Sequence, residues 1–196
     1  YDLTELQRDA NKKYGYSAKQ TLSYMQSLYE RHKVLTYPRT DSRYITDDIV
    51  ATIPERLRSI AQGPYQKAAM TLYRRPLSTK YIVNNAKVTD HHAIIPTEQP
   101  ANFSKLTYEE RNIYDLVVRR FIAVLSEECE YDEVKVTLDI GGKSFYAKGK
   151  VIKKNGWKDM YGTLADEDDE EAEIKNQQLP EMQQGMTLPV QNTKIV

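Results

Sequence analysis

The chain has 196 residues, of which 40% are hydrophobic, and its 28 Lys and Arg residues balance 28 Asp and Glu residues. This composition suffices for one sizeable domain or two modest ones. No apolar run approaches the roughly eighteen residues that would span a bilayer, and no charged-then-apolar start resembles a secretion signal. We therefore expect a soluble, cytoplasmic protein that has no membrane partner.

The ends and the single cysteine give further expectations. The chain starts without methionine and ends on Lys194-Ile195-Val196, which resembles the middle of a strand, so we expect a piece of a larger protein. Cys129 cannot form an internal disulfide and has no partner at metal-ligand spacing. We expect it to be a small buried residue at a helix end.

Charge divides the chain into two parts. Residues 1–129 hold 19 Lys and Arg against 15 Asp and Glu, whereas residues 130–196 hold 9 against 13. The positive excess of the first part favours an anionic partner there. Solubility alone explains such an excess equally well.

The first part shows helical patterns. Residues 3–14 predict a short polar helix that Gly15 closes, and Ser17 is expected to cap a longer helix that runs to about His32. Apolar residues at helical spacing predict its buried stripe. They are Ala18, Leu22, Met25, Leu28 and Tyr29. Pro38 prevents the helix from continuing, so the residues around it are expected to form a loop held by packed helices.

Further helices follow this loop. Thr46 is expected to cap an acidic first turn, Pro54 suits the start of a short helix that reaches Ile60, and residues 64–74 again predict a helix. Residues 76–104 lose the periodicity. Thr107 and Glu110 form a capping box that begins the most regular helical pattern in the chain. Its apolar positions are Ile113, Leu116, Val117, Phe121, Val124 and Leu125.

After Glu130 the apolar period changes to two, which predicts strands. Gly141-Gly142 predicts a two-residue hairpin turn that sets Leu138 opposite Phe145 and Val136 opposite Ala147. Asn155-Gly156 predicts another turn, residues 166–173 an acidic solvated loop, and the end of the chain a further strand after Gly185. We expect an α+β fold with a helical domain over residues 1–128 and an antiparallel β-rich domain over residues 129–196.

A cluster of reactive side chains lies on the expected loop, in the run Thr36-Tyr-Pro-Arg-Thr-Asp-Ser-Arg43. Attack by Tyr37 on a phosphodiester would give an aryl phosphodiester that stores the broken bond, so resealing would need no ATP. Arg39 can neutralise the phosphate, and Thr40, Ser42 and Arg43 can donate to neighbouring phosphates. With 15 tyrosines in the chain, however, a tyrosine beside an arginine is more often a packing or cation–π contact.

Residues 35–42, Leu-Thr-Tyr-Pro-Arg-Thr-Asp-Ser, closely resemble the active-site motif of type IA DNA topoisomerases, in which the tyrosine attacks single-stranded DNA. Residues 15–22 and 28–30 resemble the helix that precedes this tyrosine in the family. Residues 90–96, Asp-His-His-Ala-Ile-Ile-Pro, resemble the second active-site element. The paired histidines and the residues around the tyrosine are most similar to the bacterial topoisomerase III branch of the family.

The resemblance implies roles for individual residues. Tyr37 would be the nucleophile that becomes bonded to a 5′ phosphate, Arg39 would position the scissile phosphate, and His91 would contact it. Further DNA contacts would come from Lys19, Thr40, Asp41, Ser42, Arg43 and His92. Without the resemblance, a capped loop or a partly buried pair of histidines is the favoured interpretation of His91 and His92. The β-rich part would belong to the arch around the DNA.

The resemblance also implies partners. In this family a separate TOPRIM domain supplies a lysine and a Mg²⁺ site built on Asp-x-Asp-x-Glu. Asp166, Asp168 and Glu170 match these letters, but they lie in an uninterrupted acidic run without the strand that precedes the family motif. We therefore expect no metal site in this chain, a TOPRIM domain elsewhere in the parent protein, no activity of the chain alone, and a location at the nucleoid.

Two other classes compete with this interpretation. A single-stranded nucleic-acid-binding module without chemistry would also use the basic first part, and it stays open as the alternative. A tyrosine recombinase would need a His-x-x-Arg element and a tyrosine near the C-terminus. None of the three histidines has an arginine three residues later, and Tyr37 lies early, so we discard this class.

Overall fold

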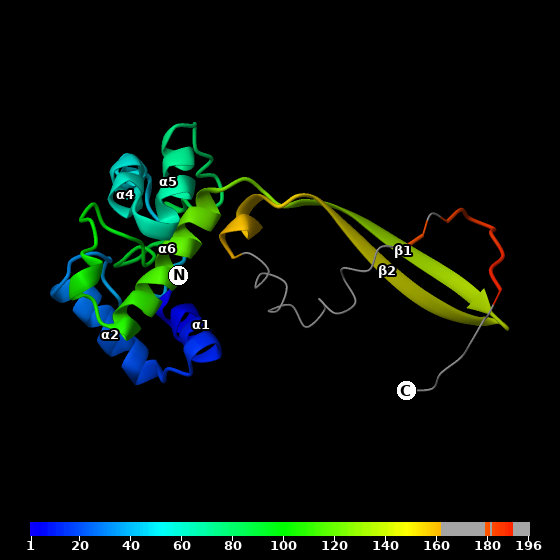
Figure 1. The fold of residues 1–196 in the computed structure, drawn as a ribbon, viewed down its shortest axis with the longest axis horizontal. Coiled ribbons are helices and arrows are strands. Elements are labelled where there is room, and N and C mark those ends of the chain that lie inside the picture. The colour runs from blue at the N-terminus through cyan, green and yellow to red at the C-terminus, as the bar shows by residue number, and fades with distance from the viewer. Residues whose placement is uncertain (162–178, 181, 190–196) are drawn as a thin grey trace. The chain divides into compact units, whose positions relative to one another are not determined.

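The computed structural model of the chain describes residues 1–161, 179–180 and 182–189. Their contacts group into two compact units, a helical one and a β-hairpin (Figure 1). The helical unit contains α1 (Leu3–Tyr14), α2 (Ala18–Glu30), α3 (Asp47–Val50), α4 (Ile53–Ile60), α5 (Gln66–Tyr73), α6 (Tyr108–Leu125) and the short 3₁₀ helices η1 (Gly63–Tyr65), η2 (Asn85–Lys87), η3 (Phe103–Lys105) and η4 (Gly156–Met160). The hairpin contains β1 (Glu130–Ile140) and β2 (Lys143–Lys154). The expected α+β fold class is confirmed.

The ends of the long helices follow local sequence signals. Gly15 ends α1 with a φ of 72°, a left-handed conformation that glycine adopts without steric cost. Capping boxes begin α2 at Ser17 and α6 at Thr107, as predicted.

The predicted cap at Thr46 is wrong, because its side chain bonds no backbone N–H of α3. The Asn85 side chain accepts from the N–H of Asp47 at 3.0 Å instead. The Asp47 carboxylate accepts from Asp48 N, also at 3.0 Å. The first donors of this short helix are therefore already satisfied.

The core lies where α1, α2 and α6 meet, and α5 packs on α6. Its largest fully buried side chains include Leu6, Met25, Leu28, Leu35, Leu57, Ile60, Ile113, Tyr114 and Ile122.

The predicted stripe of α2 is partly wrong. Thr21, Met25 and Leu28 are its buried residues, whereas Ala18 and Tyr29 are exposed. On α6, Val124 is exposed although its neighbours Ala123 and Leu125 are buried. Only the residues on the face of a helix that other helices cover are buried, and an apolar residue at the margin of that face stays exposed to water.

Cys129 is half-buried and lies beyond the end of α6, so the prediction of a buried residue at a helix end is wrong. The chain is already extended at Ser126, with φ −80° and ψ 168°, which carries Cys129 away from the helix.

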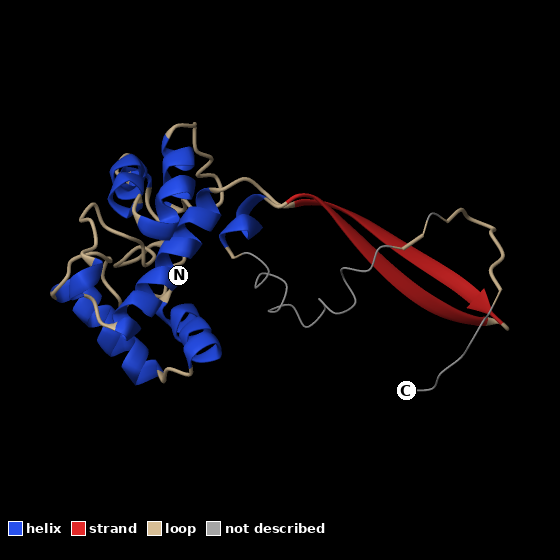
Figure 2. Cartoon of the chain, viewed as in Figure 1, coloured by secondary structure: helices blue, strands red, loops and turns tan. Residues whose placement is uncertain are grey.

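The hairpin has the predicted register. Val136 pairs with Ala147 and Leu138 with Phe145, and both turn glycines have positive φ, 61° and 76°. Figure 2 shows the two strands as one twisted ribbon. Much of its apolar face is exposed within the described residues, including Val134, Ile140 and Phe145.

After the hairpin the chain returns to α6 through η4. The N–H of Trp157 donates to Glu127 O at 2.9 Å, and the guanidinium of Arg119 donates to Met160 O at 2.5 Å. Gly156 permits this approach, since its φ is 55° and a Cβ there would lie 2.3 Å from Glu128 O. The predicted turn at Asn155-Gly156 is thus confirmed.

The remaining expectations concern the end of the chain and the domain division. The acidic residues 166–173 lie outside the described residues. Residues 186–189 of the expected last strand are not in a strand, and its remainder is outside the described part. The division into domains at residues 128 and 129 stays a prediction. Among the described residues, no helix is both long and apolar enough to cross a membrane.

Candidate active site

Two segments far apart in the sequence pair with each other at the candidate site. We call residues 34–45 the tyrosine loop and residues 89–97 the histidine segment. An antiparallel bridge joins Leu35 to Pro96, with hydrogen bonds of 3.0 Å from Thr36 N to Ile95 O and from Thr97 N to Val34 O. Burial of the apolar residues of both segments holds the pair in the core. The two elements that carry the reactive residues therefore lie side by side.

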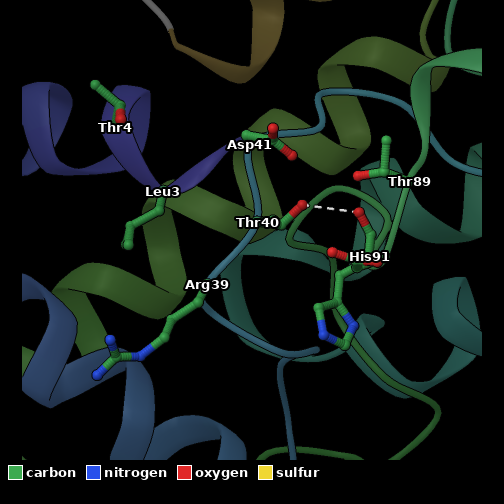
Figure 3. Close-up of a pocket in the computed structure, with 8 residues that line it drawn as sticks. Leu3, Thr4, Arg39, Thr40, Asp41, Thr89 and His91 are labelled. Carbon is green, nitrogen blue, oxygen red and sulfur yellow. Dashed lines mark hydrogen bonds between the residues drawn. The ribbon is translucent and has the colours of Figure 1, made fainter.

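Hydroxyl groups fasten this pairing. Thr40 Oγ1 donates to His91 O at 2.8 Å, which Figure 3 shows as the link between the two segments, and it accepts from Ser42 N at 3.1 Å. Ser42 Oγ donates to Lys87 O at 2.8 Å. Both residues are buried. Their hydroxyls hold the loop in this structure, and the predicted contacts of Thr40 and Ser42 with phosphates stay predictions.

Tyr37 lies half-buried between two other rings. Its ring centroid is 4.3 Å from that of His91 and 5.4 Å from that of Tyr29. Among the described residues, its hydroxyl has no hydrogen-bond partner. The phenol is thus fixed by ring contacts while its oxygen stays available for a reaction.

A pocket of about 430 Å³ lies beside these rings and is lined in part by His91. It is lined by Leu3, Thr4, Arg39, Thr40, Asp41, Thr89, Asp90 and His91 (Figure 3). Arg39 is the one permanent cation among these described lining residues. In Figure 3 the side chains of Arg39 and His91 extend away from Asp41. Arg39 and His91 can therefore meet an anion without facing the Asp41 carboxylate.

Arg43 has a different environment from Arg39. Its guanidinium binds Asp2 Oδ2 at 2.6 Å and Glu5 Oε1 at 3.1 Å, which joins the tyrosine loop to the start of α1. Burial opposes ionisation of Asp2, but the Glu5 N–H and Arg43 outweigh it, so the pKa of Asp2 is lowered. These ion pairs give Arg43 a structural role, and its DNA contact stays a prediction.

The structure brings Tyr37, Arg39, Thr40, Asp41 and His91 together, but not every predicted residue joins them. Lys19 is exposed in the first turn of α2, and no contact with the loop is present among the described residues. His92 is half-buried, and its Nδ1 lies 2.7 Å from Ala93 O. It therefore faces its own backbone.

Sequence reasoning missed two residues that support the site. Tyr29 was expected in the core of α2, yet its ring contacts Tyr37. Arg56 of α4 is buried and donates to Pro96 O at 2.6 Å while it pairs with Glu98 at 2.8 Å. Burial lowers the pKa of Arg56, and Glu98 opposes this shift. An arginine in an amphipathic helix carries no sequence signal for such a contact.

The described residues do not fit the Mg²⁺ ion that the sequence resemblance implies. Within them, no group of three or more His, Cys, Asp or Glu side chains could hold a metal ion. Asp166, Asp168 and Glu170 lie outside this part of the chain.

Comparison with known proteins identifies the family. The family described as DNA topoisomerase matches residues 1–196, and the chain belongs to it. The proteins named DNA topoisomerase 3 of a Bacillus cereus strain and of Bacillus subtilis (strain 168) are 55% and 52% identical to it over 191 residues, or 97% of the chain. The family inferred from the tyrosine and histidine motifs is thereby confirmed. The chain spans about a quarter of these relatives, 26% of each.

A solved structure shares the fold. Full-length topoisomerase I from Thermotoga maritima superposes with a TM-score of 0.56 at 24% identity. The match covers 83% of this chain and 26% of that chain. At this identity the likeness concerns the fold alone.

Proposed function

We propose that the chain is the tyrosine-bearing part of a type IA DNA topoisomerase, which cleaves and rejoins single-stranded DNA to allow strand passage. The pairing of the tyrosine loop with the histidine segment carries this proposal. It sets the phenol of Tyr37 against His91, next to a pocket that Arg39 also lines. The names of the relatives support the same activity.

The proposed reaction exchanges one phosphodiester for another. Tyr37 Oη forms a bond to phosphorus and loses its proton, the bond from phosphorus to the 3′ oxygen breaks, and that oxygen gains a proton. The products are a 5′-phosphotyrosine and a 3′ hydroxyl. Rejoining is the reverse attack, so neither ATP nor another energy source is consumed.

Arg39 and His91 serve this reaction through charge and hydrogen bonding. The guanidinium can hold two phosphate oxygens at once and stabilise the charge that develops in the transition state. Lys19, Thr40, Asp41, Ser42, Arg43 and His92 remain proposed contacts to the flanking DNA. The Mg²⁺ site and the TOPRIM domain are proposed to lie in the part of the parent protein that corresponds to the remaining length of the relatives. The proposed location of the protein is the cytoplasm, at the nucleoid.

The test uses a full-length protein that carries this sequence. It is incubated with end-labelled single-stranded DNA and Mg²⁺, denatured, and examined for a protein–DNA adduct. We expect an adduct that maps to Tyr37, disappears in Tyr37→Phe, and persists in the control Tyr81→Phe, whose residue is exposed on a loop. The chain by itself should give no adduct.

The same assay separates the alternative function. A non-catalytic nucleic-acid-binding module would slow the migration of the labelled DNA in a native gel without forming an adduct. Tyr37→Phe would not change this binding. An adduct that survives Tyr37→Phe would also contradict the proposed nucleophile.

A further inference from the structure

Tyr37 depends on its neighbouring rings for its orientation. The backbone on its N-terminal side is fixed by the hydrogen bonds of Thr36 to the histidine segment, and Pro38 on the other side is buried. These bonds place the Cα atom but leave the side-chain torsions free. Because the Tyr37 hydroxyl has no hydrogen-bond partner among the described residues, the ring contacts with Tyr29 and His91 are the described interactions that orient it.

The two neighbouring rings differ in how firmly they are held. His91 is exposed on the histidine segment, and among the described residues its side chain contacts the Tyr37 ring but forms no hydrogen bond. Tyr29 stands on α2, one residue after the fully buried Leu28. A side chain on a packed helix supplies a more rigid contact than one on an exposed loop.

The geometry between Tyr29 and Tyr37 is favourable. The rings cross at 83° with centroids 5.4 Å apart, the edge-to-face arrangement in which the positive ring edge meets the negative ring face. Tyr29 is 37% exposed, so this contact buries only part of the ring. Tyr29 thus contacts the candidate nucleophile from a position outside the buried core.

We propose that Tyr29 is a positioning residue that holds the ring of Tyr37 in the orientation needed for attack on phosphorus. This inference rests on the proposed function of Tyr37. The ring of Tyr29 performs the task, and its hydroxyl is not required. Tyr29→Phe keeps the contact, whereas Tyr29→Ala lets the Tyr37 side chain sample other rotamers.

The kinetic test compares these variants in the full-length protein. In Tyr29→Ala we expect the maximal rate of adduct formation to fall by about 10-fold or more, because a small misplacement of a reacting atom slows attack strongly. The DNA concentration for half-maximal rate should not change, and Tyr29→Phe should restore the rate.

The matched control is Tyr73→Ala. Tyr73 is also a tyrosine near the end of a helix, α5, and is 39% exposed, but it contacts Arg58 instead of Tyr37. The Tyr73→Ala protein should form the adduct at the same rate as the unsubstituted protein.

A second measurement needs no activity. In the chain with isotope-labelled tyrosines, the Hα–Hβ couplings of Tyr37 report its χ1 rotamer, whereas its chemical shifts would change simply because a neighbouring ring is lost. These couplings should become averaged in Tyr29→Ala and stay unchanged in Tyr29→Phe and Tyr73→Ala. If Tyr29→Ala does not fold, Tyr29→Leu serves in both measurements, because it keeps an apolar side chain without an aromatic ring.

Three results would overturn the positioning role. They are an unchanged maximal rate in Tyr29→Ala, a loss of rate in Tyr29→Phe as large as that in Tyr29→Ala, and a change in Tyr29→Ala that is confined to the DNA concentration for half-maximal rate. The last would assign Tyr29 to DNA binding. The absence of an adduct in the unsubstituted protein would instead contradict the proposed function, and the Tyr37 couplings would still report whether Tyr29 holds Tyr37.

Discussion

Two arginines of the tyrosine loop differ in what their guanidinium groups contact. Arg43 is bound by Asp2 and Glu5, whereas Arg39 is exposed and forms no ion pair among the described residues. A guanidinium that already binds two carboxylates has fewer donors left for a phosphate. Arg39 is therefore the better anion ligand, although both arginines lie on the same loop.

Replacing Arg39 tests this difference. In the full-length protein, Arg39→Ala should leave folding unchanged and slow adduct formation by about 10²–10³-fold, the usual effect of losing one preorganised charge at a transition state. Arg39→Lys should recover only part of the rate, because an ammonium cannot make the planar two-point contact. Arg58→Ala, at an exposed arginine of α4, is the control. A full rate in Arg39→Ala would remove Arg39 from the site.

Between elements, Glu110 joins α2 to α6. Its carboxylate accepts from Ser27 Oγ at 2.6 Å and from Thr107 N at 2.8 Å, and His32 Nε2 lies 3.3 Å away. Burial raises the pKa of Glu110, but the bonds from Ser27 and Thr107 and the charge of His32 outweigh it, so its pKa lies below the ordinary 4.5. The junction fixes the helix end that carries Tyr29 and leads into the tyrosine loop.

This lowered pKa predicts how stability depends on pH. A carboxyl group with a lowered folded-state pKa stabilises the fold above its ordinary pKa, and this contribution disappears as the pH falls through the folded value. Glu110→Gln should lower the free energy of unfolding by about 1–2 kcal/mol at neutral pH. The difference from the unsubstituted chain should shrink below about pH 4.

Urea denaturation across this pH range measures the effect. Glu109→Gln is the control, because Glu109 lies in the same first turn of α6 but is not among the buried residues. A loss of stability in Glu110→Gln that is the same at all pH values would show that the charge contributes nothing.

In the whole molecule, the hairpin is inserted into the sequence of the helical unit, which contains residues 1–129 and 155–162. Glu130 pairs with Lys154 at the base of the hairpin, so the chain leaves and re-enters the helical unit at neighbouring points. η4 then packs on α6 through the bond of Arg119 to Met160, and Trp157 bonds Glu127 just beyond the end of α6. The helical unit therefore contains residues from both sides of the hairpin in sequence, and the partly buried Met160 packs against its core.

Removing the hairpin tests this arrangement. A chain in which a short Gly-Ser turn replaces residues 130–154 should keep the helical circular dichroism and a thermal midpoint within about 4 °C of the parent, a shift that corresponds to less than about 1 kcal/mol. Cooperative unfolding should also persist, because the buried core of the helical unit does not include the hairpin. Loss of the cooperative transition would show that the helical unit depends on the hairpin.

The helices, the hairpin register and the two reactive segments could be predicted from the sequence. Capping at Ser17 and Thr107, the Gly141-Gly142 turn and the apolar periods depend on residues close together in the chain, so they can be predicted without the fold. The family was likewise evident from residues 35–42 and 90–96, since a reactive cluster of this kind is rare.

Which of these side chains contact one another depends on the packing of distant segments. The pairing of Leu35 with Pro96, the contact of Tyr29 with Tyr37 and the bond from Arg56 to Pro96 join separate segments. Tyr29 was expected in the core, yet packing leaves it exposed. Arg43 pairs with Asp2 and Glu5 at the start of α1, and its contact with a phosphate stays a prediction. Periodicity shows that a side chain is apolar, whereas only the packed neighbours determine what it touches, because those neighbours come from distant parts of the chain.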